Sequence, residues 1–331
     1  MQDFVGAKGV IAAERLAELS ERSNWQGLVQ LAGHFGAIVV TGWALFETGG
    51  SWLSLPLFML LGVLLNYLYA PTHECDHFTA FKSRWLNIWV ARLCGFIIFN
   101  PSDHHRWTHF AHHRNTQDWQ KDTELDRSEI RTAGQYLLAL SGLPLIRSKL
   151  GSIMKHAFVG VDEWYLTPGQ QQRVKLAARW HVAGYAIAIG SALALQSWWV
   201  LMFWWGPFFL MRWSYMLQGL GEHTGLTHQP HTLWNTRTFR TNWFMRWVNW
   251  NMTFHCVHHT FPSVPFYRLP ILHQEVEQRL GFALPTISYS KLHWQQVLAF
   301  RKGSTELEIC LEHENQLLAT GRFGAVISKE N

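Results

Sequence analysis

The sequence predicts an all-α integral membrane protein with four transmembrane helices in two hairpins, capped on one side by histidine-rich helices. Three observations lead to this fold class. Charged residues are only 15% of the chain, while 19 Trp and 21 Phe help to bring aromatic residues to 15%, a balance typical of a protein that sits in a bilayer. Long apolar runs occur in two closely spaced pairs. Histidines gather in three short stretches outside those runs.

The first 30 residues are predicted to form an N-terminal amphipathic, cytoplasmic segment, with a short surface helix over residues 8–23. Glu14 and Glu18 precede any apolar run, so we expect no cleavable signal peptide. The four cysteines form no C-x-x-C pair, which fits a reducing compartment. The net charge of +5 is not gathered into a basic arm with aromatic stacking positions, so we expect no nucleic-acid partner.

The first hairpin is predicted from apolar runs at residues 31–49 and 52–70. No Lys or Arg occurs between Arg22 and Lys82, and each run approaches the roughly 20 residues that cross a bilayer. Residues 85–100 are also apolar, but Arg92 interrupts them. We therefore predict an interfacial or re-entrant helix there.

The second histidine cluster is predicted to lie on a helix over residues 104–113, with Ser102 or Asp103 as its N-terminal cap. The polar stretch at residues 115–131 leaves two interpretations open. It is either a solvated loop, or some of its carboxylates contact metal-binding histidines. Residues 135–160 contain Gly142 and charged residues, so we expect them to lie in the membrane plane or packed on the domain.

The second hairpin is predicted at residues 180–196 and 198–217, which contain no Lys and only Arg212. Four spans place both termini and all histidine clusters on one side, and the Lys and Arg residues make that side cytoplasmic. The membrane domain is expected to cover residues 31–273, followed by a C-terminal cytoplasmic segment at residues 274–331.

The three histidine clusters share a spacing that favours metal binding. In a helix, four of the histidines between residues 104 and 113 occupy one arc of about 100°. Neutral imidazoles are good ligands for iron, zinc and copper. His223 follows the last predicted span as His73 follows the second, and is a further candidate. The clustered candidates are His73, His77, His105, His109, His112, His113, His255, His258 and His259.

Eight or nine histidines are too many for one metal ion, so the sequence predicts two. A histidine-rich site without thiolate pairs suits non-haem iron, which can activate oxygen. Because the site lies where the spans leave the membrane, a C–H bond of a lipid could reach it. A membrane zinc hydrolase with Glu74 or Asp76 as base is the alternative from another class. It would leave at least five histidines without a role. A metal carrier is disfavoured because only His34 and His181 lie in or near the spans.

The clusters, their order and the two hairpins resemble the membrane fatty acid desaturase family with its three histidine boxes. The resemblance runs from about Leu31 to His273, and residues 255–265 are similar to the third box and its proline-containing continuation. It implies a di-iron centre with O2 as co-substrate, no organic cofactor, and no catalytic residue beyond the metal ligands. The implied ligands are His73, His77, His109, His112, His113, His223, His255, His258 and His259.

His105 lies outside the shared pattern and is expected, with Glu74, Asp76 and Glu222, to support the ligands. The resemblance also implies a fatty acyl or lipid substrate, a bacterial inner membrane, and a separate electron donor of ferredoxin or cytochrome type. The chain has no His-Pro-Gly-Gly and no clustered cysteines to hold a redox group of its own.

Desaturation is the reaction that the resemblance favours, with hydroxylation next and decarboxylation to a terminal alkene third. All three can begin with hydrogen abstraction, and the outcome depends on placing the chain within about an ångström. Arg237, Arg240 and Arg246 are either ordinary cytoplasmic positive charge or a docking surface for an acidic donor or an acyl headgroup.

Overall fold

The computed structural model describes residues 9–125, 130–226, 228 and 231–303, and these residues are mostly helical. Within that part of the chain the only strands are β1 (Thr238–Phe239) and β2 (Thr286–Ile287), which pair in parallel. The prediction of a helical protein is therefore confirmed apart from this short ladder. Cys310 and the rest of the C-terminal segment after residue 303 lie outside the described residues.

The N-terminal helix is shorter than the one predicted over residues 8–23. Helix α1 covers Ala13–Leu19, and Gly9 before it has a φ of +86° that no helix accommodates. Arg15 on α1 pairs with Glu275 of α14 (Leu269–Leu280), with 2.6 Å between Nη2 and Oε1. The side chain of Leu19 is buried. The helix is thus packed on the domain.

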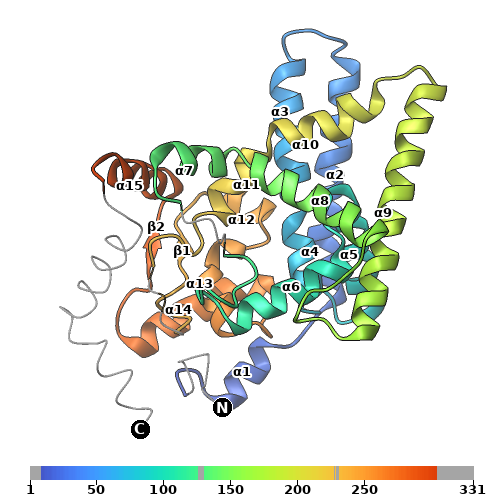
Figure 1. Ribbon diagram of the computed structural model, residues 1–331. Helices are drawn as coiled ribbons and strands as arrows, with labels where there is room; N and C mark the ends of the chain where they lie inside the picture. The colour runs from blue at the N-terminus through green and yellow to red at the C-terminus, as the bar shows by residue number, and fades with distance from the viewer. Residues whose placement is uncertain (1–8, 126–129, 227, 229–230, 304–331) are drawn as a thin grey trace.

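The first predicted hairpin is formed by α2 (Asn24–Glu47), α3 (Ser54–Asn66) and α4 (Tyr69–Asp76). Helix α2 begins seven residues before the predicted span because Ser23 Oγ accepts from the backbone of Gln26. Asn24–Glu47 and Ser54–Asp76 are long and apolar enough to cross a membrane. Figure 1 shows α2 and α3 side by side, joined by a short loop at one end of the molecule.

The second predicted hairpin has a different internal structure from the first. Helix α9 (Pro168–Ala194) begins 12 residues before the predicted span, at a capping box between Thr167 and Gln170. The last predicted span is divided into a π-helix, η1 (Leu201–Trp205), then α10 (Gly206–Leu210) and α11 (Arg212–Gly219). Pro207 lacks a backbone donor at this break. Neither segment meets the length and hydropathy criteria that the first two spans meet.

A third candidate span is the bent pair of α7 (Ala133–Leu140) and α8 (Leu143–Phe158), whose axes differ by 57°. Two helices, or three if the bent pair counts as one, could therefore cross a membrane among the described residues. Apolar side chains on α2 and α9 are largely exposed: Val39 is 66% exposed, Phe46 69% and Leu193 73%. Such faces suit contact with lipid.

The cap is built from short helices that meet beneath the first hairpin (Figure 1). As predicted, α5 (Arg84–Ile97) and α6 (Ser102–Arg114) are helices. Neither Ser102 nor Asp103 caps α6, which begins after Pro101. Asp103 instead pairs with Arg92 Nε at 3.0 Å. This ion pair explains how α5 accommodates the charge inside its apolar sequence.

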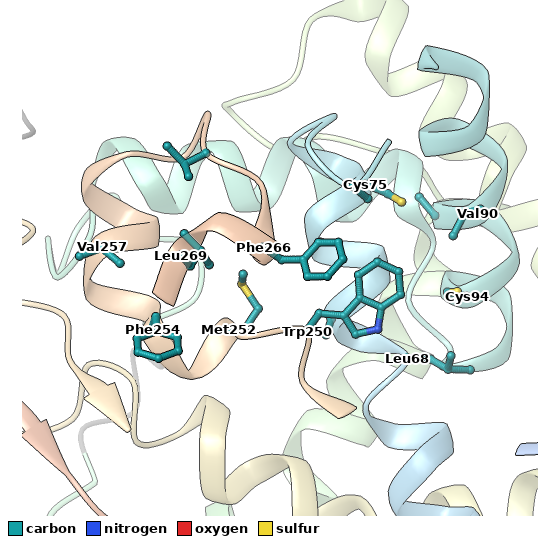
Figure 2. Close-up of a cluster of buried hydrophobic side chains, with 14 of the residues drawn as sticks. Leu68, Cys75, Val90, Cys94, Trp250, Met252, Phe254, Val257, Phe266 and Leu269 are labelled. Carbon is teal, nitrogen blue, oxygen red and sulfur yellow. The ribbon is translucent and has the colours of Figure 1, made fainter. Parts of the chain in front are cut away.

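The rest of the cap follows α11 and packs around a buried aromatic cluster. It comprises α12 (Trp243–Val248), η2 (Met252–Phe254), α13 (His255–Thr260), η3 (Phe266–Arg268), α14 and α15 (Tyr289–Arg301). Figure 2 shows Trp250, Met252 and Phe266 gathered between the segment that carries Cys75 and the segment that carries Val257. This packing fixes α13, with the third histidine cluster, against α4, with the first.

Candidate metal centre

Helices α4, α6 and α13 and the turn after α11 bring the predicted histidines into one interior region. The histidines form two neighbouring groups, within each of which one donor atom per residue lies within 4.8 Å of the others. The first group is His73, His77, His109, His113 and His258; the second is His112, His223 and His259. Residues more than 180 positions apart in sequence thus converge on two adjacent sites.

Several imidazole nitrogens in these groups are buried without a hydrogen-bond partner. Both ring nitrogens of His73 and of His258 are in this state, as are Nε2 of His223 and Nε2 of His259. A buried polar atom without a partner costs about 1–3 kcal/mol, and native proteins contain few. Metal ions would satisfy one nitrogen of each of these rings, and an all-imidazole donor set suits iron, zinc or copper. The residues present therefore fit a pair of metal ions.

Burial keeps most of these imidazoles neutral, which is the metal-binding form. Burial and the neighbouring histidines hold the pKa of His109, His258 and His259 well below the usual range. Burial and His112 lower the pKa of His223 to about 3. These side chains offer lone pairs and do not carry repelling positive charges.

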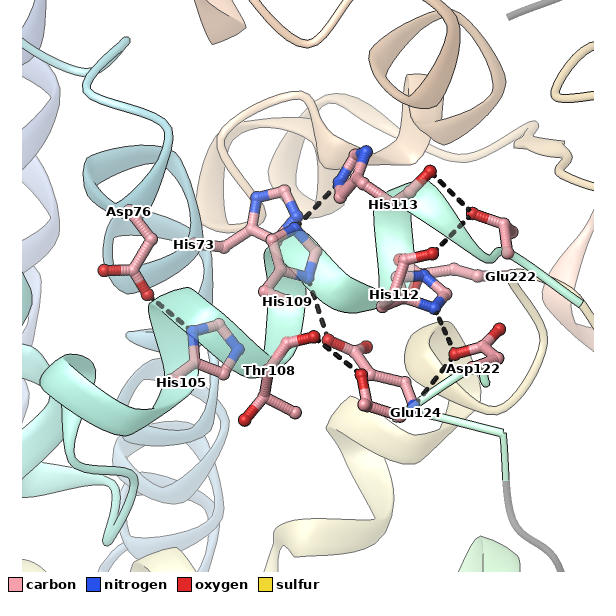
Figure 3. Close-up of polar contacts among 12 residues, drawn as sticks. His73, Asp76, His105, Thr108, His109, His112, His113, Asp122, Glu124 and Glu222 are labelled. Carbon is pink, nitrogen blue, oxygen red and sulfur yellow. Dashed lines mark hydrogen bonds and ion pairs between the residues drawn. The ribbon is translucent and has the colours of Figure 1, made fainter. Parts of the chain in front are cut away.

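Hydrogen bonds on the outer side orient three of the rings. His109 Nδ1 donates to Glu124 Oε1 at 2.8 Å, and His112 Nδ1 donates to Asp122 Oδ1 at 2.7 Å (Figure 3). His223 Nδ1 donates to the carbonyl oxygen of Asn235 at 2.9 Å. With the proton held at Nδ1, the lone pair at Nε2 is free for a metal. In the polar stretch at residues 115–131, Asp122 and Glu124 therefore contact candidate metal-binding histidines, which was the second of the two interpretations. Asp126 and Arg127 lie outside the described residues.

His112 differs from the other rings because of its carboxylate neighbours. Burial alone would lower its pKa, but Asp122 and Glu124 outweigh burial and raise the pKa to about 9. The same interaction lowers the pKa of Asp122. Asp122 is therefore ionised and polarises the ring, which makes Nε2 of His112 a stronger donor to a cation.

His255 is near the second group but is not one of its closely spaced members. Its ring centroid lies 4.4 Å from that of His259 and 5.3 Å from that of His223. Its Nε2 is 3.5 Å from Glu222 Oε2, and its Nδ1 has no partner. Burial raises the pKa of Glu222 to about 8. The structure thus places Glu222 beside His255, a predicted ligand at the edge of the second group.

The other predicted supporting residues lie on the first-box side. His105 Nδ1 donates to Asp76 Oδ2 at 2.6 Å, and its Nε2 is 3.1 Å from the hydroxyl of Tyr69. Both nitrogens of His105 therefore have partners. Glu74 Oε1 lies 4.0 Å from His73 Nδ1 and 3.8 Å from His258 Nδ1, between two boxes.

Sequence reasoning missed several residues that touch the candidate ligands. Thr116 Oγ1 lies 3.2 Å from His259 Nδ1, and the Asn235 carbonyl and the Tyr69 hydroxyl contact His223 and His105. No sequence pattern marks them, because each contact depends on how distant segments pack. Of the three arginines considered for docking, Arg237 is buried and donates to the carbonyl of Thr224. It is therefore not part of an exposed docking surface.

A further cluster of His104, His156 and Glu163 also has donor atoms within 4.8 Å of one another. Its atoms already have partners: His156 Nε2 donates to Glu163 at 2.6 Å, and His104 Nε2 is 3.1 Å from the Tyr165 hydroxyl. None of its ring nitrogens is left buried and unpaired. This cluster is a hydrogen-bond network, unlike the two groups described above.

A cleft of about 450 Å³ reaches the first group at His113. Trp119 and His228 line it and stack on each other with ring centroids 4.5 Å apart. Asn235, whose carbonyl orients His223, also borders the cleft. The cleft gives the buried histidines one route to the surface.

The family model described as fatty acid desaturase matches residues 50–291, which include all the clustered histidines. The chain belongs to the fatty acid desaturase family. The expectation from the three histidine boxes is confirmed.

Curated relatives of this desaturase-family chain carry acyl-lipid desaturase names. It is 25% identical over 274 residues to an sn-1 oleoyl-lipid 12-desaturase of Picosynechococcus sp., covering 79% of this chain and 65% of the relative. A protein of the same name from Arthrospira platensis is 24% identical over 238 residues, with coverages of 70% and 57%. A Nostoc sp. sn-1 acyl-lipid omega-3 desaturase (ferredoxin) is 30% identical over 105 residues, 29% of each chain. The chain spans less than two thirds of the length of the relatives it matches.

Proposed function

We propose that this protein is a membrane-bound di-iron oxidoreductase that uses O2 to introduce a double bond into a fatty acyl chain. The observation that carries the proposal is the pair of adjacent histidine groups, whose buried nitrogens have no partner in the protein. The names of the relatives support an acyl-lipid substrate class. Two of them are named as ferredoxin enzymes, which supports a separate electron donor of that type.

The two iron ions would be held by the two histidine groups, with His255 joining the second group. When bound, the irons supply oxygen activation and the abstraction of hydrogen from an unactivated C–H bond. The protein side chains position the ligands. Asp122 and Glu124 hold the Nδ1 protons of His112 and His109.

The proposed arrangement in the membrane has four spans in two hairpins, with both termini and the cap in the cytoplasm of a bacterial cell. Residues 31–273 would form the membrane domain. The exposed apolar faces of α2 and α9 support it. The divided segment at residues 201–219 would complete the second hairpin, since backbone that departs from a regular helix is tolerated at membrane depth where protein buries it. Met211, where the segment breaks between α10 and α11, is buried, whereas none of the residues of η1 is buried.

The test combines metal analysis with product analysis on detergent-purified protein and on lipids from expressing cells grown in air. About two irons per chain and products lighter by two hydrogens are expected. Products with an added oxygen, or a volatile alkene, would replace desaturation with hydroxylation or decarboxylation at the same centre. One zinc per chain with oxygen-independent hydrolysis would contradict the proposal and favour the zinc hydrolase.

Two alanine variants separate the candidate ligands from other buried histidines. His258→Ala is expected to lose iron and turnover while it stays in the membrane fraction, because His258 belongs to the first group and its ring nitrogens are buried without a partner. His156→Ala is the matched control, since His156 is equally buried but belongs to the hydrogen-bonded cluster. Retained iron in the first variant, or loss in the second, would refute this assignment of the ligands.

A further inference from the structure

Arg212, at the start of α11, is a buried cation that forms no ion pair with a carboxylate of the described residues. Its side chain is 6% exposed. Nη1 donates to Asn66 Oδ1 at 3.2 Å, and the guanidinium lies over the rings of Phe208 and Tyr215, 5.6 Å and 4.5 Å from their centroids. No Asp or Glu oxygen pairs with it among the residues that the structure describes. A buried charge without a counter-charge is costly, so buried arginines are nearly always paired.

The site around Arg212 is preorganised. Asn66 is fully buried, and its amide nitrogen donates to the carbonyls of Gly62 and Phe208, both at 2.8 Å. These two bonds fix the amide so that its oxygen faces the guanidinium. One neutral acceptor uses only one of the five N–H donors of an arginine. The orientation of Arg212 is therefore set by a partner that leaves its charge unbalanced.

The turn between α7 and α8 covers this position. Gly142, in the turn, has a φ of +78°, and a Cβ there would collide with Arg212 Cγ. A buried guanidinium beneath this turn, without a carboxylate partner among the described residues, favours an anionic ligand.

Aromatic rings connect Arg212 with the candidate metal centre. The guanidinium lies over Tyr215, whose ring centroid is 4.7 Å from that of Tyr69. Tyr69 in turn is 5.8 Å from the ring of His73 in the first box. An anion held at Arg212 would thus lie two rings from a proposed ligand. A chain attached to that anion could reach the metal centre.

We propose that Arg212 binds the carboxylate of an unesterified fatty acid, so that the substrate is held by its acid end inside the protein. This rests on the proposed function and names its substrate class. A carboxylate matches the planar, two-pronged geometry of a guanidinium. The relatives, in contrast, are named for acyl-lipid substrates.

The test measures binding of ligand, and it requires neither turnover nor added electron donor. Palmitic acid, methyl palmitate and a short-chain phosphatidic acid are titrated onto detergent-purified, metal-loaded protein, with tryptophan fluorescence and native mass spectrometry as readouts. The expected result is that wild type binds palmitic acid at least tenfold more tightly than the methyl ester. Equal affinity for the acid and the ester would overturn the proposal, and tighter binding of the phosphatidic acid would assign the site to a lipid phosphate.

Substitutions of Arg212 test whether this residue causes the preference for palmitic acid over its methyl ester. Arg212→Gln is expected to abolish the preference for the acid, while Arg147→Gln, which removes the same charge from an exposed position on α8, preserves it. Arg212→Lys, which keeps the charge but not the two-pronged geometry, serves if the Gln variant does not elute as a single metal-loaded species, and it should reduce the preference. An undiminished preference in the Arg212 variant that is measured would refute the site. Because wild-type binding is measured directly, an absent reaction would refute the proposed function without affecting this result.

Discussion

His112 Nδ1 donates a 2.7 Å hydrogen bond to Asp122, which lies on the loop that follows the same helix. Asp122 also accepts from the backbone nitrogens of Gln117 and Glu124 at 2.7 Å and 2.9 Å. The loop after α6 is therefore folded around a carboxylate that holds one ring of the second histidine group. Helix α6 and its loop form a unit in which ligand and support are near in sequence.

Asp122→Asn is expected to lower metal occupancy of the second group. An amide that donates to Nδ1 would move the ring proton to Nε2, where it blocks the lone pair. Loss of such a partner costs about 10- to 100-fold in metal affinity or activity. Metal analysis after dialysis against a graded chelator measures it. Asp118→Asn is the control, since Asp118 caps the turn at Gln120 and contacts no candidate ligand among the bonds described above; equal metal loss in both variants would contradict the role of Asp122.

The local part of the centre could be predicted from sequence, because helical spacing alone places His105, His109, His112 and His113 on one face of α6. Periodicity does not say which histidine of that face supports the others. His105 has that role because its partners, Asp76 and Tyr69, come from α4 and meet it through tertiary packing. The choice of Asp122 and Glu124 among the acidic residues after α6 likewise depends on the path of the loop.

The membrane segments were predictable to a different degree. Apolar runs located the first hairpin, but hydropathy carries no information on breaks. Part of the interruption between α10 and α11 comes from a tertiary contact, because Asn66 on α3 donates to the Phe208 carbonyl. The early start of α9 had a sequence signal, the Thr167–Pro168–Gln170 capping pattern, which a search for apolar runs passes over.

Removing the metal is expected to destabilise the cap. Ligand binding to the folded state alone adds about 4 kcal/mol when the free ligand is a thousand times its Kd. Without metal, the unpaired nitrogens of His73 and His258 would remain buried. The measurement is the midpoint of thermal unfolding before and after treatment with an iron chelator, followed by iron restoration. An unchanged midpoint in a protein shown to have lost its iron would contradict a structural contribution of the metal.

Gly62 is expected to be essential for packing α3 against α10. A Cβ at this position would collide with the Pro207 carbonyl and lie 2.5 Å from Met211 Cγ. Small residues allow such close approach of membrane helices. Gly62→Ala should therefore destabilise the protein by about 1–3 kcal/mol, as overpacking does.

The measurement for Gly62 is the temperature at which half the detergent-solubilised protein loses its monodisperse elution peak. Gly36→Ala is the control, because a Cβ at Gly36 on α2 meets nothing within 4 Å. It should leave this temperature unchanged or raise it, since alanine favours helix. A Gly62 variant as stable as the Gly36 variant would mean that α3 and α10 adjust freely.

Alanine substitutions at Gly142 and Gly281 would distinguish the cost of backbone strain from the cost of close packing. Both have a positive φ, +78° and +72°, but a Cβ at Gly281 meets no atom within 4 Å, whereas one at Gly142 collides with Arg212. Gly281→Ala should cost about 1 kcal/mol, the usual penalty for a left-handed residue other than glycine. Gly142→Ala should cost more, because the α7–α8 turn must also move away from Arg212. Comparing the two melting temperatures tests this; equal losses would show that the turn does not press on Arg212.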